Sequence, residues 1–315
     1  MAKAPLQASA PGKAILFGEH AVVYGQPAIA VPVSQVRAIA SVEPASPGSG
    51  LTIVAEDTNE SAALATAPAD HPLAAVARAV LAHAGASEPD ATLTISSTIP
   101  IASGLGSGAA VSTALVRALA DHLQCRLEPA DVSALVFEVE KIHHGTPSGI
   151  DNAVIAYERP VYFISGQPVE HLVVGAPLTL LVADTGRPSR TKEVVAAVRK
   201  AWQNAPARHD ALFGQIGELT NAARGALEAG NVQVLGPLMD QNHEYLRELA
   251  VSSDELDELV EAARFAEALG AKLSGAGRGG NVIALVEEDQ ADAVAEALTE
   301  AGAAKVFRTT VAPSS

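Results

Sequence analysis

The sequence predicts an α+β protein built from two domains. Apolar runs with the length and alternation of strands are mixed with segments of helical spacing, without the regular strand–helix alternation of a parallel α/β sheet. The chain has 315 residues, which is enough for two modest domains. A stretch rich in glycine and proline lies at 166–177, so we expect one domain over 1–175 and a second over 176–315.

The composition excludes several classes of protein. Hydrophobic residues make up 48% of the chain and charged residues 18%, which is typical of a globular protein and not of a disordered one. The net charge of −15 argues against a nucleic-acid partner, because the protein's field would repel phosphate backbones. It leaves a small anionic metabolite open, since such a ligand needs only a local cluster of donors.

Targeting signals are not evident in the sequence. No apolar run reaches the roughly 18 residues of a transmembrane helix, and the N-terminus lacks the pattern of a signal peptide. The single cysteine, Cys125, cannot form an internal disulfide, which indicates a reducing compartment. We therefore expect a cytoplasmic protein without membrane contact, and Cys125 as an ordinary small residue of a helix and not a reactive thiol.

The first half of the chain predicts short strands and amphipathic helices. Strands are expected at 14–17, 27–33, 36–42 and 92–96. Helices are expected at 71–83, 109–123 and 129–144, the last with Pro129 in its first turn and Gly145 as its stop.

The second half predicts a largely helical region between buried strands. A continuous apolar run at 178–183 is expected to be a buried strand, followed by helices over most of 191–269. Breaks are expected near Pro206, Gly230 and the pair Ser252–Ser253. A strand at 282–286, a helix at 290–301 and a strand at 306–309 complete this half.

A glycine loop preceding a helix is the strongest chemical signal. Three glycines fall within five positions, at Gly104, Gly106 and Gly108, and allow the backbone to approach a ligand closely. The helix that follows offers unpaired N–H groups and the positive end of its dipole, which together favour a phosphate. The loop is not a Walker A motif, because no Gly-Lys-Ser/Thr follows. A tight strand-to-helix turn remains the alternative.

Two further segments concentrate unusual residues. The segment 11–25 places Lys13, Glu19, His20 and Tyr24 beside an apolar strand, which is costly unless they meet a ligand or one another. A surface turn at a strand end is the alternative reading. The segment 273–281 carries more glycines than a hairpin turn needs, and indicates close approach of the backbone to a ligand or to another strand.

A fourth cluster spans 140–152 and contains both acids and histidines. Glu140 suits a Mg²⁺ ion, and Asp151 suits proton transfer. The adjacent His143 and His144 lack the further ligand spacing of a zinc site. Taken alone, this cluster is better explained as a solvated helix end.

Together these segments resemble the motifs of the GHMP kinase superfamily, named for galactokinase, homoserine kinase, mevalonate kinase and phosphomevalonate kinase. The motifs occur in the family's order and span nearly the whole chain. The run Gly18–Gly25 is most similar to members that act on mevalonate. Galactokinases usually continue with Thr-Asp after the Glu-His pair, and phosphomevalonate kinases typically carry Tyr where His20 stands.

The resemblance implies a fold and a reaction. The N-terminal domain would be similar to ribosomal protein S5 domain 2 and the C-terminal domain would be ferredoxin-like, with ATP and substrate meeting in the cleft between them. The expected reaction transfers phosphate from ATP, with Mg²⁺, to the 5-hydroxyl of (R)-mevalonate, giving 5-phosphomevalonate and ADP on the route to isopentenyl diphosphate. A homodimer is also expected. Arg190, Lys192 and Lys272 are candidate partners for the substrate's carboxylate.

The resemblance also assigns roles residue by residue. Asp151 would be the catalytic base and Lys13 the lysine near the reacting hydroxyl. Glu140 and Ser107 would serve Mg²⁺. The phosphate loop would comprise Ser103, Gly104, Leu105, Gly106, Ser107, Gly108 and Ala109. Positions lining the substrate would be Glu19, His20, Ser148, Thr191 and Gly277.

The sequence departs from the family pattern at two positions. The family commonly has tandem serines in the phosphate loop, where this chain has Ser107-Gly108. Ser107 or a water molecule would then complete the Mg²⁺ site. Arg278 stands where relatives more often have glycine, and could contact a phosphate or the substrate's carboxylate, or point into solvent.

Overall fold

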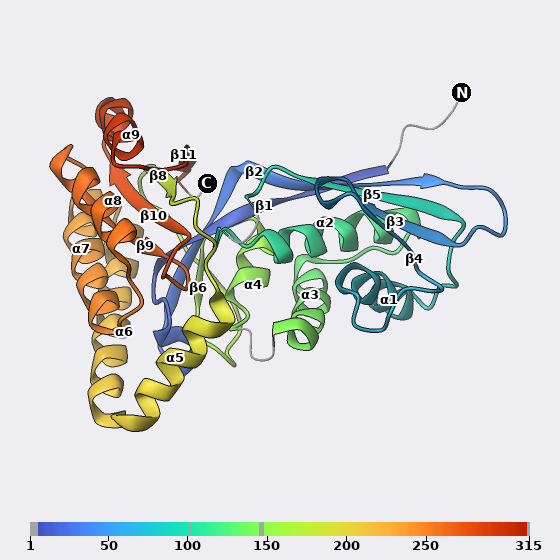
Figure 1. Cartoon of the computed structure of the whole chain (residues 1–315), viewed down its shortest axis with the longest axis horizontal. Coiled ribbons are helices and arrows are strands. Elements are labelled where there is room, and N and C mark those ends of the chain that lie inside the picture. The colour runs from blue at the N-terminus through green and yellow to red at the C-terminus, as the bar shows by residue number, and fades with distance from the viewer. Residues whose placement is uncertain (1–5, 101–102, 145–147, 314–315) are drawn as a thin grey trace. The chain divides into compact units, whose positions relative to one another are not determined.

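The computed structural model describes residues 6–100, 103–144 and 148–313 (Figure 1). By internal contacts the chain forms two compact units whose segments interleave along the sequence. The first unit comprises Met1–Gly12, Val36–Pro100 and Gly106–Glu158, and the second comprises Lys13–Gln35, Ile101–Leu105 and Arg159–Ser315. The expected division of the chain at residues 175 and 176 stays a prediction.

The first unit contains a mixed sheet with helices packed on it. Its strands are β3 (Leu51–Ala55), β4 (Glu60–Ala63), β5 (Ala91–Ser97) and the C-terminal part of β2 (Ala28–Pro44). β3 pairs parallel with β5, whereas β4 with β3 and β5 with β2 pair antiparallel. The short 3₁₀ helix η2 (Glu56–Thr58) links β3 to β4.

Helix α2 is the centre of the first unit's helical layer. The helices are α1 (Pro72–Ala84), α2 (Ser107–His122), α3 (Pro129–His144) and α4 (Ile150–Tyr157). α2 packs against the other three and against β5, so the helices cover one face of the strands (Figure 1). Small residues on α2, including Ala110, Ala114 and Ala118, are fully buried and allow this close packing.

The second unit contains an antiparallel sheet with the strand order β11-β8-β10-β9. These strands are β8 (Leu178–Asp184), β9 (Gly270–Ser274), β10 (Asn281–Val286) and β11 (Lys305–Val311). The N-terminal part of β2 pairs with β6 (Val161–Phe163), which pairs with β7 (Glu170–His171). Strand β1 (Leu6–Phe17) pairs with β2, and η1 (Ala21–Tyr24) follows it.

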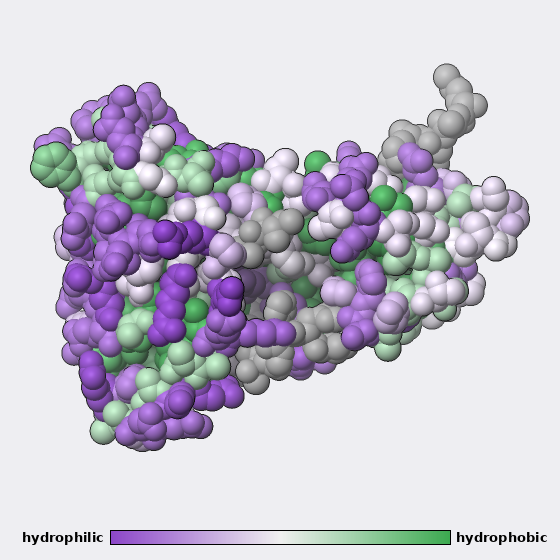
Figure 2. All heavy atoms as spheres, in the orientation of Figure 1, coloured by the Kyte–Doolittle hydropathy of each residue, from purple (hydrophilic) through white to green (hydrophobic). Residues whose placement is uncertain are grey.

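The helices of the second unit are α5 (Thr191–Asn204), α6 (Pro206–Glu228), α7 (Val232–Glu248), α8 (Asp254–Phe265) and α9 (Ala291–Glu300), the last preceded by η3 (Glu288–Gln290). α7 and α8 pack on β9, and α9 packs on β8 and β11. On the face shown in Figure 2, hydrophilic side chains predominate over these helices and the hydrophobic spots between them are small.

The two faces of β9 have different neighbours. Side chains alternate between the faces of a strand, so Ala271 and Leu273 share one face while Lys272 and Ser274 share the other. Ala271 and Leu273 belong to the hydrophobic core formed with the helices. Lys272 and Ser274 are buried on the opposite face, where they meet residues of β1 and the turn after it.

Most of the expected elements are confirmed. The helical region breaks where α5 gives way to α6 at Pro206, α6 to α7 around Gly230, and α7 to α8 at Ser252–Ser253. Gly145, the expected stop of α3, lies outside the described residues. In the described part of the chain, no helix is both long and apolar enough to cross a membrane.

Three boundaries were predicted wrongly. The strands expected at 27–33 and 36–42 are one strand, β2, because two exposed polar residues, Ser34 and Gln35, do not interrupt the extended backbone. β1 begins at Leu6 and not at 14, since small residues such as Ala8 and Ala10 can also occupy a strand. α2 begins at Ser107, inside the glycine loop, after Gly106 at its N-cap.

A contact between two glycines sets the approach of α7 to β9. A Cβ on Gly236 would lie 1.9 Å from the carbonyl oxygen of Leu269, and a Cβ on Gly270 would lie 2.2 Å from that of Gly236. Neither position can accept a side chain without movement of backbone. The helix that supports β9 therefore depends on both glycines.

We predict that Gly236→Ala lowers the free energy of unfolding by about 2 kcal/mol, because the methyl group would force α7 away from β9. Gly214→Ala is the matched control on α6, since its Cβ would meet nothing within 4 Å among the described residues. The control should raise the free energy of unfolding by about 0.5–1 kcal/mol through helix propensity. Urea unfolding measures both, and equal effects would contradict the packing argument.

Candidate active site

In chain order, the first motif is the segment 11–25, the second is the glycine loop at 103–108 and the third is the segment 273–281. The turn after β1 holds the first motif in an unusual backbone conformation. Gly18 has φ +96°, and a Cβ there would lie 2.4 Å from the carbonyl oxygen of Pro27, so only glycine fits. His20 has φ 60°, which is uncommon for a residue with a side chain. A strained turn persists only when its surroundings hold it, and such turns are concentrated at functional sites.

A buried contact with Lys272 holds Glu19 in this turn. The Lys272 Nζ donates to Glu19 Oε1 and, at 2.7 Å, to the carbonyl oxygen of Leu273. Both side chains have no exposed surface. Burial raises the pKa of Glu19 and lowers the pKa of Lys272, while the attraction between them opposes both shifts. The Lys272–Glu19 pair therefore links the first motif to β9, and β9 leads into the third motif.

His20 is fixed as a neutral ring by a second contact with the third motif. Its Nε2 lies 2.9 Å from the carbonyl oxygen of Ala276, which can only accept a hydrogen bond, so Nε2 carries the proton. Burial lowers the pKa of His20 to about 4, and the positive charge of Arg278 acts in the same direction. Nδ1 of the neutral ring is therefore an acceptor, suited to a hydroxyl group.

The end of β1 is fixed by hydrogen bonds on both sides of Lys13. Ser274 Oγ accepts from the Ile15 N–H and donates to the Ile15 carbonyl oxygen, both at 3.0 Å. The Lys13 N–H donates to the carbonyl oxygen of Leu105 at 3.0 Å, which ties β1 to the glycine loop. The Lys13 side chain is itself buried. Lys13, Glu19, His20 and Ser103 thus lie in one well-connected part of the second unit.

The third motif also anchors the loop that leads into α5. The Gly280 carbonyl accepts from the N–H and the hydroxyl of Thr185, each at 2.9 Å. Ser189 Oγ donates to the Gly277 carbonyl at 2.9 Å. A Cβ on Gly277 would lie 2.0 Å from the carbonyl oxygen of Val251. The glycine run therefore serves close packing of backbone on backbone, one of the two readings that its composition allowed.

Arg278 has a protein partner. It adopts φ 52°, its N–H donates to the Val251 carbonyl at 2.8 Å, and its Nε donates to the Ala250 carbonyl at 3.1 Å. The residue is nonetheless exposed. These bonds attach the third motif to the segment between α7 and α8. A contact of Arg278 with phosphate or carboxylate stays a prediction.

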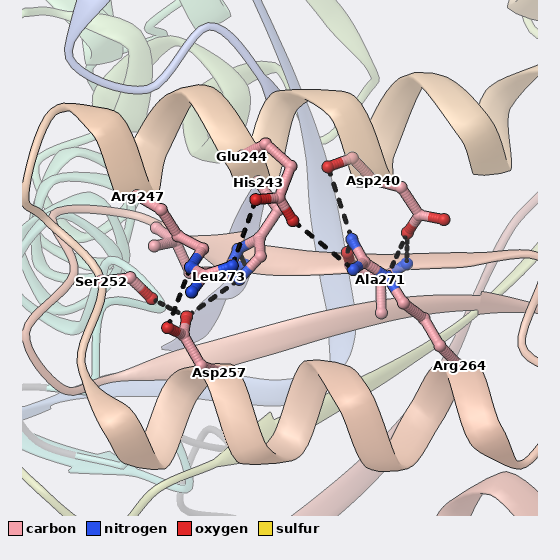
Figure 3. A network of polar contacts seen from close by, with 9 residues as sticks. All are labelled: Asp240, His243, Glu244, Arg247, Ser252, Asp257, Arg264, Ala271 and Leu273. Atoms are coloured by element: carbon pink, nitrogen blue, oxygen red, sulfur yellow. Dashed lines mark hydrogen bonds and ion pairs between the residues drawn. The ribbon is translucent and has the colours of Figure 1, made fainter.

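Side chains of α7 satisfy the outer edge of β9 (Figure 3). Because β9 is the edge strand of its sheet, the N–H groups of Ala271 and Leu273 point away from β10. Asp240 Oδ1 accepts from Ala271 at 2.9 Å, and His243 Nδ1 accepts from Leu273 at 3.3 Å. These bonds fix the residues on either side of Lys272.

The histidine in this network is neutral and fixed in one tautomer. Since Nδ1 of His243 accepts, Nε2 carries the proton and donates to Asp257 Oδ1 at 3.0 Å. Burial lowers the pKa of His243 to about 4. Asp257 also binds Ser252 Oγ and Arg247 Nε, as Figure 3 shows. The helical side of β9 is thus an ordered polar network around a neutral ring.

The first unit gathers the remaining candidate residues on packed helices. Ser107 is the first residue of α2, Glu140 lies in α3 and is half-buried, and Asp151 lies in the first turn of α4 and is half-buried. α2, α3 and α4 pack on one another. Ser148 precedes α4, where its Oγ lies 3.4 Å from the Ile150 nitrogen.

The start of α2 has the features of an anion site. Its first N–H groups, from Ser107 to Ala109, have no acceptor within the helix, and the helix dipole adds positive potential there. A Cβ on Gly108 would meet nothing within 4 Å among the described residues. A second serine would therefore fit at this position, so the missing hydroxyl is not imposed by packing.

Three residues of the site were missed by the sequence reasoning or given another role. Lys272 was a candidate partner for the substrate's carboxylate, but it is buried against Glu19. Arg190 and Lys192 remain as the candidates for that role. Ser274 and Asn281 were not singled out, although both are buried and hydrogen-bonded to the motifs. Polar residues at every second position of an apolar strand were the available signal. Thr191 is exposed at the first position of α5.

We predict that Lys272→Met lowers the free energy of unfolding by about 3–5 kcal/mol, because it leaves the Glu19 carboxylate buried without its partner. The double variant Lys272→Met/Glu19→Leu should recover most of this loss. Arg126→Met, which removes one half of an exposed ion pair with Glu128, is the control and should change little. A double variant no more stable than the single one would contradict the assignment.

Comparison with known proteins places the chain in a family. The models of the N-terminal and C-terminal domains of GHMP kinases match residues 71–159 and 223–304. Mevalonate kinases of Thermococcus onnurineus and Thermococcus sibiricus are 37% and 36% identical to it, each over 94% of this chain and 93% of the relative.

Solved structures give the same result. Mevalonate kinase of L. major, in complex with R-mevalonate, matches with a TM-score of 0.84 and 32% identity over 100% of both chains. Mevalonate kinase of Methanococcus jannaschii matches with a TM-score of 0.84 and 26% identity over 99% of both chains. The predicted α+β, two-domain fold is confirmed, and the chain belongs to the GHMP kinase family.

Proposed function

We propose that this chain transfers the γ-phosphoryl group of ATP to the 5-hydroxyl of (R)-mevalonate, giving 5-phosphomevalonate and ADP on the route to isopentenyl diphosphate and isoprenoids. The observation that carries the proposal is the full-length likeness to mevalonate kinases, one of them solved with R-mevalonate. The presence of Lys13, Glu140 and Asp151 supports catalysis over passive binding of nucleotide.

The phosphates of ATP would bind the glycine loop from Ser103 to Ala109. Backbone N–H groups at the start of α2 would bind the phosphate oxygens, and the helix dipole would stabilise their negative charge. This mode of binding uses backbone and needs no cationic side chain in the loop. It also fits a protein of strongly negative net charge, because the attraction is local.

The oxygen donors of the first unit fit Mg²⁺. Glu140 offers a carboxylate and Ser107 a hydroxyl, both hard ligands. The described residues contain no group of three or more His, Cys, Asp or Glu able to hold a metal ion by themselves. One carboxylate and one hydroxyl, from Glu140 and Ser107, suit Mg²⁺, which usually binds through one or two carboxylates together with phosphates. Bound there, the ion would neutralise charge on the transferring phosphoryl group.

Asp151 and Lys13 would act on the alcohol. Asp151 would accept the proton of the 5-hydroxyl, and Lys13 would stabilise the charge that develops on its oxygen. Phosphoryl transfer passes through a loose transition state, so positioning contributes more than early proton removal.

The remaining candidates would bind the rest of mevalonate. Neutral His20 offers Nδ1 as an acceptor to a hydroxyl, and Glu19 is held beside it by Lys272. Arg190 and Lys192, at the start of α5, are the candidates for the substrate's carboxylate. Ser148, Thr191 and Gly277 would line the same site. The cytoplasmic location and the homodimer stay predictions.

We predict that ADP release, monitored by a coupled assay with Mg²⁺ and ATP, is fastest with (R)-mevalonate. The panel of substrates also includes phosphomevalonate, galactose and homoserine as the alternatives within the family. The 3-hydroxyl of mevalonate is the alternative acceptor within the preferred substrate itself. Phosphorus NMR of the product identifies the oxygen that is phosphorylated. A higher kcat/KM for another alcohol, or ATP binding without turnover of any, would contradict the proposal.

We predict that Asp151→Ala lowers kcat at least about 100-fold, the effect of losing a positioned base. Asn152→Ala is a neighbouring comparison on the same helix. Asn152 donates to Ser133 within α3, so this change should act on stability more than on kcat. Near-normal turnover of Asp151→Ala would remove Asp151 from the reaction.

A further inference from the structure

A buried asparagine of the third motif contacts the beginning of the phosphate loop. Asn281 is the first residue of β10, opposite Ser274 of β9 and Asp184 of β8. It is 1% exposed, on a strand that is otherwise apolar. Its Nδ2 donates to the carbonyl oxygen of Ser103 at 2.5 Å. Both residues belong to the second unit, as does Leu105.

The remaining atom of this amide is not used by the fold. Because a carbonyl only accepts, Nδ2 must point to Ser103, which leaves Oδ1 as an acceptor. Within the described residues Oδ1 is buried and has no hydrogen-bond partner. A buried acceptor without a partner is destabilising, and leucine would fill a similar volume without it. Stability of the strand therefore does not account for an amide here, whereas its bond to the loop does.

The loop residues 103–105 contact other segments of the second unit at several points. A Cβ on Gly280 would lie 2.8 Å from the Ser103 carbonyl oxygen, and a Cβ on Gly104 would lie 3.7 Å from Asn281 Nδ2. The Leu105 carbonyl accepts from the Lys13 N–H at 3.0 Å. Two alternate carbonyls of the loop are thus turned toward partners in the second unit.

The direction of these carbonyls sets the direction of the loop's N–H groups. In a trans peptide, the carbonyl of one residue and the N–H of the next point in opposite directions. No cis peptide occurs among the described residues. With the Ser103 carbonyl held by Asn281, the N–H of Gly104 points away from Asn281. In the same way, the Leu105 carbonyl points toward the Lys13 N–H, so the N–H of Gly106 points away from Lys13. Backbone N–H groups of a loop that are turned toward one ligand form an anion site.

We propose that Asn281 is a positioning residue for ATP: by holding the Ser103 carbonyl, it orients the amide of Gly104 for a phosphate. The proposal rests on the proposed function, because it assigns the loop to ATP. It adds a residue of the third motif, which would act on the nucleotide through the backbone of the glycine loop at 103–108. Asn281 does not itself touch the ligand.

The test measures ATP binding and loop docking separately. Asn281→Leu should raise the Kd for AMPPNP with Mg²⁺, measured by calorimetry, and the KM for ATP by about two- to tenfold, as expected for one lost hydrogen bond. The KM for mevalonate should change less. The Lys13 amide should exchange its hydrogen faster in the full-length variant, because its acceptor on Leu105 is released.

Thr309→Val is the matched control. Thr309 is 1% exposed on β11 of the same sheet, and its Oγ1 likewise has no partner among the described residues. This change should leave nucleotide affinity and the exchange of the Lys13 amide unchanged. Asn281→Ser, whose side chain is too short to reach Ser103, is the second variant if Asn281→Leu does not fold.

The outcomes separate this inference from the proposed function. If the wild-type chain binds AMPPNP but the Asn281 variants bind it equally well, or exchange at Lys13 is unchanged, the positioning role is overturned. A loss of affinity in Thr309→Val as large as in Asn281→Leu would also overturn it. If the wild-type chain binds no nucleotide, the proposed function fails, and the exchange of the Lys13 amide still decides whether Asn281 holds the loop.

Discussion

The buried contact between Lys272 and Glu19 is the constraint on which the candidate site depends. Each side chain is fully buried, so neither could keep its place without the other. The contact joins β9 to a turn with positive φ at Gly18 and His20, and a turn of that kind returns to a relaxed conformation unless it is held. Lys272 holds Glu19, and the Ala276 carbonyl holds His20.

β9 can perform this task because it is held on both sides. Toward the helices, Asp240 and His243 bind the N–H groups of Ala271 and Leu273, and the Gly236–Gly270 contact sets the distance to α7. Toward β1, Lys272 and Ser274 bind the first motif. A strand at the edge of a sheet would otherwise leave its N–H groups open, and its side chains would be placed less accurately. The polar network on the helical side thus contributes to the geometry of the site without facing it.

The sequence predicted the helices and the breaks between them because these signals are local, whereas the roles of the acidic candidates stay predictions. Glycine spacing, helical periodicity and the breaks at Pro206 and Gly230 can each be read within a few residues. The partner of Glu19 could not be predicted in this way, because Lys272 lies 253 positions away and a lysine in an apolar strand has several possible roles. The continuity of β2 was missed for a different reason: Ser34 and Gln35 look like a break, although a strand tolerates two exposed residues when its neighbours on both sides stay buried.

The glycine-rich third motif connects several segments of the second unit. Its backbone binds Thr185, Ser189 and Val251, and Ala276 and Asn281 within it bind His20 and Ser103. Glycine is required at Gly277 because the Val251 carbonyl leaves no room for a Cβ, whereas Arg278 is tolerated because its N–H and Nε both bind the segment after α7. Within one short run, Gly277 therefore allows close packing of backbone on backbone, and Arg278 attaches the motif to the neighbouring segment. If the loop at 103–109 binds ATP as proposed, a substitution at Asn281 would change nucleotide binding without any contact with the nucleotide, because Asn281 holds the Ser103 carbonyl and so sets the orientation of the next peptide group.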